Sequence, residues 1–111
     1  CPTANLEIDG RKFLPGEGVY AAWTTCQKYN ESFQSVMNLG PQPTINPLAP
    51  SAVEVHLLDK EMYLYDLNLT VKPVKKIRSQ IKFKSVDDLS KQIYKDKEAA
   101  KKILNEFTKF I

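Results

Sequence analysis

One acidic side chain lies inside a segment that alternates in polarity, where a carboxylate can take part in proton transfer. Residues 52–58 read AVEVHLL, so Val53 and Val55 share one face of an extended chain and Glu54 and His56 share the other. If the polar face lines a cavity, Glu54 is suited to act as a general base; if the face is solvated, Glu54 is an ordinary surface acid. We interpret His56, a lone histidine, as structural.

Two neutral oxygen-bearing side chains near the start of the sequence are suited to contact a hard cation. Thr3 and Asn5 lie two residues apart after Pro2, so both point to one side if the chain is extended. Mg²⁺ takes few protein ligands and keeps waters and substrate phosphates, so a sparse pair of this kind is sufficient beside ATP. The alternative interpretation is a turn that leads into a strand.

A basic and an aromatic residue mark the segment KKIRSQIKF at 75–83. Arg78, which we expect in a loop, can clamp a phosphate or stack on a flat ring, although most loop arginines are simply solvated. Phe83 is expected to anchor the loop to the core. The sequence contains no Walker loop, no dinucleotide glycine motif and no Ser-His-Asp or paired-histidine motif, so the commonest nucleotide-binding folds are excluded.

Short strands separated by turns must position these residues. Turn-forming stretches such as DG, PGEG, YNES and GPQPTINPLAPS divide the first three quarters of the sequence. The segments between them are rich in β-branched and aromatic residues or alternate in polarity, and they are 18–26, 33–39, 52–58 and 67–74. Pro73 is expected to prevent the last segment from continuing as a central strand. Strands without intervening helices predict a mainly β fold, an antiparallel sheet that is closed or nearly closed.

The last quarter of the sequence changes to helical spacing. Ser85 begins a stretch that resembles a capping box, and Val86, Leu89 and Ile93 then fall on one helical face. Asp96 is expected to cap a second helical stretch. The apolar residues of that stretch are Ala100, Ile103, Leu104, Phe107 and Ile111. The sequence therefore predicts a C-terminal helix packed on the β-sheet.

Composition limits the class of protein. The 111 residues, 42% hydrophobic and 26% charged, fit one folded domain, and no apolar run is long enough to cross a bilayer. Cys1 and Cys26 lack metal-site spacing, which favours a reduced, cytoplasmic protein. Residues 60–111 carry thirteen basic and seven acidic side chains and could attract a nucleotide or a nucleic acid, although a lysine-rich solvated helix is the plainer interpretation.

Six sequence blocks, in order, resemble those of a riboflavin kinase. They are PTAN at 2–5, PGEGVYAAW at 15–23, SVMNLGPQPT at 35–44, AVEVHLLD at 52–59, YLYDLNLTVKPVKKIR at 63–78 and FKSVDDLSKQIYKD at 83–96. Together they cover nearly the whole sequence, so the ordered set is far more specific than any single block. More narrowly, the sequence is similar to the kinase module of the bacterial bifunctional riboflavin kinase/FAD synthetase.

The resemblance implies a fold, a reaction and a site. The fold is an antiparallel Greek-key β-barrel with a C-terminal helix, and the reaction is the ATP-dependent phosphorylation of the riboflavin 5′-hydroxyl to give FMN. The resemblance also implies that Thr3 and Asn5 contact Mg²⁺ and the ATP phosphates, that Glu54 is the catalytic base, and that Arg78 through Phe83 form a flap beside the flavin. Riboflavin and ATP are the expected partners, and neither a nucleic acid nor a membrane is expected.

The family also has a strand and a glycine-containing loop ahead of the PTAN block, and the bifunctional enzyme has an adenylyltransferase domain. The sequence has neither, so residues 1–111 are expected to be a kinase domain that lacks its first strand, with weak or no kinase activity in isolation. Asp66 replaces a glycine of the family pattern. Gln80 replaces a common glutamate and removes a charge from the flap.

Two other functions stay open at this point. A non-catalytic flavin-binding module would keep the flap without needing Glu54. A small nucleic-acid-binding barrel is suggested by the basic second half of the sequence. Such barrels interleave aromatic residues with lysine and arginine on their strands, whereas the positive charge here is largely helical.

Overall fold

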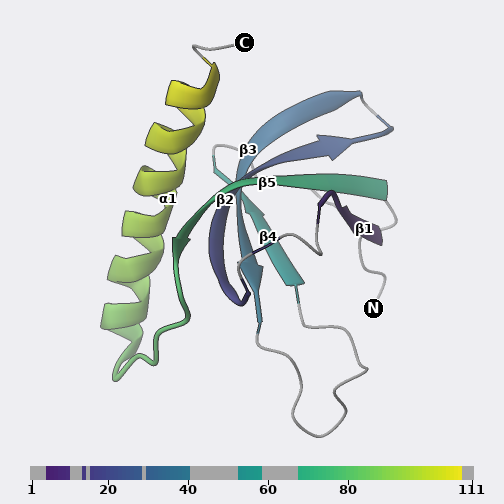
Figure 1. Cartoon of the computed structure of the whole chain (residues 1–111). Helices are drawn as coiled ribbons and strands as arrows, with labels where there is room; N and C mark the ends of the chain where they lie inside the picture. Colours follow the sequence, from purple (N-terminus) through teal and green to yellow (C-terminus); the bar gives the residue numbers. More distant parts are fainter. Residues whose placement is uncertain are drawn as a thin grey trace, which may run out of the picture.

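The computed structural model describes residues 5–10, 14, 16–28, 30–40, 53–58 and 68–108. Its secondary-structure elements are β1 (Asn5–Ile8), β2 (Gly18–Cys26), β3 (Glu31–Leu39), β4 (Val53–Leu57), β5 (Asn68–Arg78) and α1 (Val86–Thr108). The strands form one sheet in the order β1-β5-β2-β3-β4. The sheet is strongly curled, and α1 lies along its outer side (Figure 1). The predicted mainly β fold with a C-terminal helix is therefore confirmed.

The strand pairing is mixed rather than wholly antiparallel. β2 forms antiparallel pairs with β3 and with β5, and β3 forms an antiparallel pair with β4. β1, however, runs parallel to β5, with Asn5 opposite Asn68 and Ile8 opposite Val71. A parallel pair requires a long crossover between its strands, and local polarity patterns do not reveal which distant strands will meet.

β5 is longer than the expected segment 67–74 because two irregularities bend it. Its pairing with β2 skips one residue at Val74, just after Pro73, and another at Ile77, just before Arg78. An extra residue on one strand is a β-bulge, which interrupts the ladder and increases the local twist. Pro73 is tolerated because it lies at such an interruption. The prediction that Pro73 ends the strand was wrong for this reason, and Arg78 is the last residue of β5 instead of a loop residue.

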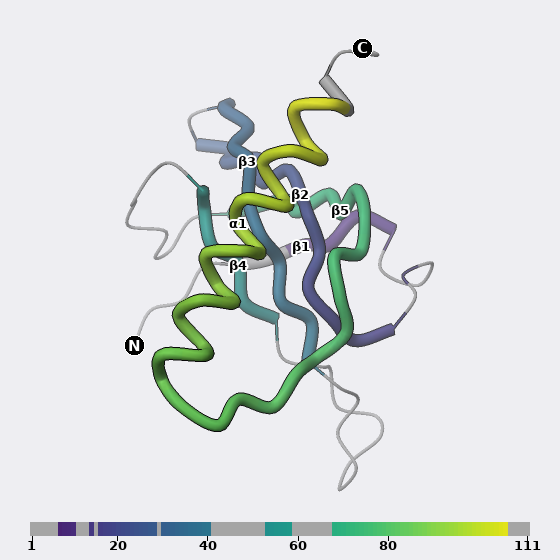
Figure 2. Tube along the Cα trace, turned by 90° about the vertical axis from the view of Figure 1, so that its left-hand side faces the viewer, coloured from purple at the N-terminus to yellow at the C-terminus, as the bar shows by residue number. Residues whose placement is uncertain are grey.

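The sheet separates two apolar cores. The inner core lies on the concave face and consists of Tyr20, Ala22, Met37, Leu39 and Val71, with Ile8, Leu14, Val53 and Val55 packed against it. The outer core lies between the sheet and α1 and is formed by Val19, Ala21, Val36, Ala100 and Leu104. Because alternate residues of a strand point to opposite faces, the same strands serve both cores. Figure 2 shows α1 in front of β2 and β3 on what we call the helix-side face of the sheet.

α1 is one continuous helix of 23 residues. The backbone N–H of Asp88 donates to Oγ of Ser85 at 3.1 Å, so the predicted cap is present. Asp96 lies in the middle of α1 and is only 5% exposed, so the expectation that it begins a second helical stretch was wrong. No glycine or proline interrupts the helix before it, and the carboxylate of Asp96 is used in a side-chain ion pair instead of a cap.

Candidate active site

A row of four residues crosses four strands at one end of the sheet. Val19 of β2 pairs with Arg78 of β5 and with Asn38 of β3, and Asn38 pairs in turn with Glu54 of β4. Directly paired residues project from the same face of a sheet, and Arg78 contacts α1, so the row lies on the helix-side face. With strands about 4.8 Å apart, its ends are roughly 14 Å apart. We call Arg78, Val19, Asn38 and Glu54 the cross-strand row.

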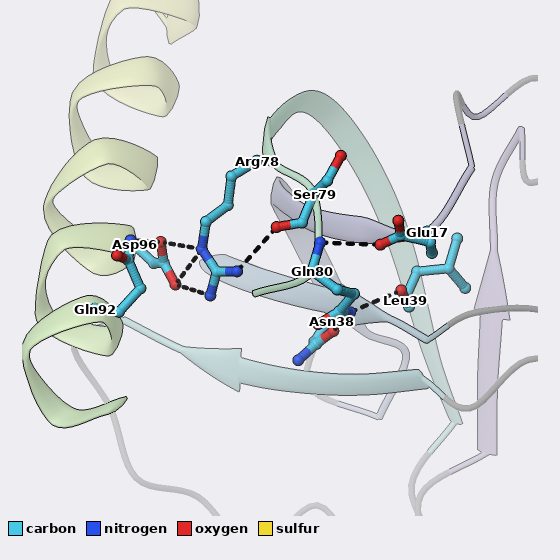
Figure 3. Close-up of polar contacts among 8 residues, drawn as sticks. All are labelled: Glu17, Asn38, Leu39, Arg78, Ser79, Gln80, Gln92 and Asp96. Atoms are coloured by element: carbon cyan, nitrogen blue, oxygen red, sulfur yellow. Dashed lines mark hydrogen bonds and ion pairs between the residues drawn. The ribbon is translucent and has the colours of Figure 1, made fainter. Parts of the chain in front are cut away.

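Arg78, at one end of the row, is fixed to α1 by an ion pair. Its Nε donates to Oδ1 of Asp96 at 2.9 Å, and its Nη2 donates to Oδ2 at 2.8 Å (Figure 3). The Nη1 group donates to the carbonyl oxygen of Ser79 at 3.1 Å, and Gln92 donates to Oδ1 of Asp96 at 3.0 Å. The side chains of Arg78 and Asp96 are 16% and 6% exposed. The arginine is thus held in one orientation, with its charge matched by a carboxylate.

The ring of Phe83 lies against the same guanidinium group. The ring centroid is 5.9 Å from Cζ of Arg78, within the range of a cation–π contact. Phe83 is half-buried at the end of the segment that leads from β5 to α1. The structure therefore brings together the two residues that the resemblance assigned to a flap, Arg78 and Phe83.

Gln80 attaches this segment to the middle of the row. Its backbone N–H donates to Oε2 of Glu17 at 3.0 Å. Its side-chain Nε2 donates both to Oδ1 of Asn38 and, at 3.1 Å, to the carbonyl oxygen of Leu39 (Figure 3). A glutamate carboxylate could not donate either of these two bonds. Gln80 therefore attaches the segment between β5 and α1 to β3 by two hydrogen bonds that require a side-chain amide.

Gly18 allows β2 to approach β5 beside Arg78. Its φ angle is 150°, which side chains rarely permit. A Cβ atom added at this position would lie 2.5 Å from the carbonyl oxygen of Arg78 and 2.6 Å from Cε of Lys76. The position of the Arg78 backbone thus depends on a residue without a side chain.

Glu54 lies at the other end of the row, on the edge strand β4. Its side chain is 73% exposed, and its Oε2 is 3.8 Å from Nε2 of His56, whose side chain is 63% exposed. The predicted alternation is confirmed, because Val53 and Val55 pack on the inner core while Glu54 and His56 are exposed. The carboxylate of Glu54 is accessible to a ligand from solvent.

Of the two expected cation ligands, Thr3 and Asn5, the structure describes only the backbone of Asn5. Thr3 and the side chain of Asn5 lie outside the described residues. The backbone of Asn5 lies in β1, which is the opposite edge strand from β4, although Ile8 of β1 and Val53 of β4 both pack against the inner core. The approach of Thr3 and Asn5 to Glu54 stays a prediction. Within the described part of the chain, no group of three or more His, Cys, Asp or Glu residues could hold a metal ion.

Exposed apolar side chains lie near the anchored end of the row. Ile81, Leu89 and Ile93 are 47%, 39% and 44% exposed. Leu89 and Ile93 precede Asp96 at helical spacing, so they continue the side of α1 that faces the sheet. A shallow surface hollow lined by Ser90, Lys91, Tyr94 and Lys95 lies on another side of the helix. Ile81, three residues after Arg78, and Leu89 and Ile93, which precede Asp96 on α1, together form an exposed apolar group that we call the apolar stripe.

Sequence reasoning missed two residues of this arrangement. Asn38 lies in the segment SVMNLG, and the sequence alone does not single it out. Only its cross-strand pairing with Glu54 places it beside the expected catalytic base. Asp96 was assigned to a helix cap, whereas it is the ion-pair partner of Arg78. A signal for Asp96 was present, because a single acid on the apolar side of a helix requires a partner when it is buried.

Comparison with protein families and curated proteins gives a consistent result. The model of the riboflavin kinase family (Flavokinase) matches residues 1–104. Several curated relatives carry the name bifunctional riboflavin kinase/FMN adenylyltransferase. The protein of Haemophilus influenzae is 44% identical over 94% of this chain and 33% of the relative. The corresponding values are 34%, 89% and 31% for Bacillus subtilis, and 37%, 90% and 31% for Escherichia coli K12. The chain thus spans about a third of the length of these relatives.

A solved structure shares the fold. It is a crystal structure of a protein from Streptococcus pneumoniae named as a macrolide-efflux protein. It matches with a TM-score of 0.66 and 26% identity, over 79% of this chain and 28% of the other. Among the residues that the structure describes here, no helix has the length and apolar character needed to span a membrane. The family match over residues 1–104 and the identity to the curated relatives agree, and this chain belongs to the riboflavin kinase family.

Proposed function

We propose that this chain transfers the γ-phosphoryl group of ATP to the 5′-hydroxyl of riboflavin, giving FMN and ADP, within an enzyme that also makes FAD. The family membership supports the reaction class. The observation that carries the proposal to particular residues is the cross-strand row, which aligns an exposed carboxylate, Glu54, with the anchored Arg78 on one face of the sheet.

Glu54 has the chemistry of the acceptor for the hydroxyl proton. As the 5′-oxygen of riboflavin forms a bond to the γ-phosphorus, the bond from that phosphorus to the β,γ-bridging oxygen breaks, and the hydroxyl proton passes to the carboxylate of Glu54. Phosphoryl transfer has a loose transition state, so positioning and charge neutralisation contribute most of the rate enhancement. Glu54 therefore orients the hydroxyl as well as accepting its proton.

Mg²⁺ is the metal proposed for this reaction, held by Thr3 and Asn5 together with the ATP phosphates. Neutral hydroxyl and amide oxygens suit Mg²⁺ when phosphates supply the negative charge, and such a donor set needs no cluster of acids. The absence of a three-residue acid or imidazole cluster in the described ranges is compatible with this donor set. When bound, the ion neutralises charge on the phosphates.

The apolar stripe is the proposed contact surface for the flavin ring. Ile81, Leu89 and Ile93 leave apolar area in water beside the Arg78 ion pair, and a flat, largely apolar ring would cover it. An Ile93→Asn variant should therefore weaken riboflavin binding severalfold, as measured by quenching of flavin fluorescence. Tyr94→Asn is the matched control, since Tyr94 is 67% exposed on another side of the helix. Equal effects of the two substitutions would contradict the placement of the ring.

Replacement of Glu54 by Gln tests the central assignment. The substitution keeps the size of the side chain and removes the proton acceptor, so turnover should fall by two or more orders of magnitude, in the range usual for general-base groups, while riboflavin binding changes little. Glu31→Gln, which alters another exposed acid of the sheet, is the control. Normal turnover in the Glu54→Gln protein would remove Glu54 from this role.

The unaltered protein itself decides between the proposed kinase and a binding module. Transfer of ³²P from labelled ATP to riboflavin in the presence of Mg²⁺ is the expected result for the protein as it occurs in the cell, whereas residues 1–111 in isolation are expected to show weak or no transfer. Riboflavin binding without transfer would favour a non-catalytic flavin module, and binding of single-stranded oligonucleotides in its place would favour a nucleic-acid-binding barrel.

A further inference from the structure

We infer that Asn38 is a second contact for the acceptor hydroxyl, with its side-chain amide donating to the oxygen whose proton Glu54 accepts. The inference rests on the proposed function and adds to it a positioning residue on the neighbouring strand. Asn38 and Glu54 are paired directly across β3 and β4, on the helix-side face.

The orientation of the Asn38 amide follows from its hydrogen bonds. The carbonyl oxygen of Leu39 can only accept, so the Gln80 atom 3.1 Å from it must be the amide nitrogen. The same Gln80 nitrogen faces the side chain of Asn38, so the Asn38 atom that it meets must be the oxygen. The nitrogen Nδ2 of Asn38 is then directed away from Gln80, as Figure 3 shows.

The amide nitrogen Nδ2 of Asn38 and the carboxylate of Glu54 are together suited to bind one hydroxyl group. Side chains paired directly across two antiparallel strands have Cβ atoms about 5 Å apart, close enough for both to contact one small group between them. Within the described residues, Asn38 Nδ2 and Glu54 make no hydrogen bond with each other. A carboxylate accepts a hydrogen bond and an amide N–H donates one, and a hydroxyl group does both at a single oxygen.

This arrangement also suits the reaction. As the hydroxyl gives its proton to Glu54, negative charge develops on the oxygen that accepts from Asn38, and a hydrogen bond to a charged oxygen is stronger than one to a neutral oxygen. Gln80 contributes indirectly, because it turns the donor end of Asn38 toward this position. Gln80 is therefore a positioning residue for the acceptor hydroxyl.

The test compares binding of riboflavin with binding of 5′-deoxyriboflavin, which lacks only the acceptor hydroxyl. Dissociation constants are measured from flavin fluorescence quenching in the intact protein and in an Asn38→Asp variant. Asn38→Asp keeps the shape and the acceptor for Gln80 but has no Nδ2 donor, and circular dichroism checks that it folds. In the unaltered protein the missing hydroxyl removes its hydrogen bonds to both Asn38 and Glu54. In the variant only the bond to Glu54 remains, so the ratio of the two dissociation constants should be about three- to tenfold smaller, as for the loss of one hydrogen bond.

Each outcome of this experiment supports or contradicts the role inferred for Asn38. An unchanged ratio in Asn38→Asp overturns the inference and leaves the proposed function intact, because a merely structural role would weaken both ligands equally. If Asn38→Asp does not fold, Gln80→Glu replaces it, since this substitution removes the donor that orients Asn38 and should reduce the ratio likewise. If the unaltered protein neither binds flavin nor phosphorylates riboflavin, the proposed function fails and the inference with it.

Discussion

The ion pair between Arg78 and Asp96 should contribute substantially to stability, and an Asp96→Asn substitution measures it. The variant keeps the size of the side chain but leaves the arginine charge beside a neutral amide. Removal of one partner of a buried ion pair costs about 3–5 kcal/mol. Because the Arg78 side chain retains 16% exposure, we expect a loss near the lower end, about 3 kcal/mol.

Urea unfolding provides the measurement, with far-UV circular dichroism and the single Trp23 as probes. Glu98→Gln is the matched control, an exposed acid-to-amide change on the same helix, and its unfolding free energy should stay within about 0.5 kcal/mol of the unaltered protein. The double variant Arg78→Met, Asp96→Leu should be more stable than Asp96→Asn, because no unpaired charge remains.

A double-mutant cycle separates this interaction from general damage to the helix. The single variants Arg78→Met and Asp96→Leu should be coupled by more than about 1 kcal/mol, as expected for residues in direct contact. Additive losses, or a loss below about 1 kcal/mol in Asp96→Asn, would refute the view that this ion pair fixes the flap segment to α1. Such a result would leave the hydrogen bonds of Gln80 as the main attachment of the segment.

Two further predictions concern the same end of the sheet. Gly18→Ala should destabilise the fold by about 1–3 kcal/mol, because the new Cβ would meet the carbonyl oxygen of Arg78 at a φ of 150°; urea unfolding that shows no loss would contradict this. Burial of the ring, followed by the nearby Glu17 carboxylate, raises the pKa of Tyr20 above its ordinary value of about 10. The unfolded chain ionises first as pH rises, so the stability from Tyr20 is complete below pH 10 and is lost above it. Tyr20→Phe should reduce the fall in unfolding free energy above pH 10, and an identical fall would refute the assignment.

The strands that have strong polarity patterns could be predicted from the sequence. The strand pairing and the ion pair that join residues far apart in the sequence could not. The segment 18–26 matches β2, and 52–58 contains β4, because alternation and β-branched residues are local signals. The parallel pairing of β1 with β5 was not predictable, since it joins residues more than 60 positions apart. The second helix start was predicted wrongly because Asp96 was assessed without its partner Arg78, which is 18 residues away.

The residues of the candidate site likewise differ in whether a local sequence pattern indicates them. Glu54 was identifiable because one polar face of a strand carried it. The role that we infer for Asn38 depends on cross-strand register and on the orientation of a side-chain amide, and neither is encoded in a local pattern. The bulge at Ile77 places Arg78 opposite Val19 and so completes the row, and sequence spacing alone gives no indication of a bulge there.

The two apolar cores on either face of the sheet have a consequence for shortened forms of the protein. A chain that stopped before Val86 would retain the inner core but uncover Val19 and Ala21 on the face that α1 covers, and these residues are 2% and 0% exposed in the whole protein. Uncovered apolar surface favours association between copies. Nonsense or proteolytic products that end in this region should therefore precipitate instead of remaining as folded monomers, and in the cell they would be substrates for chaperones and proteases.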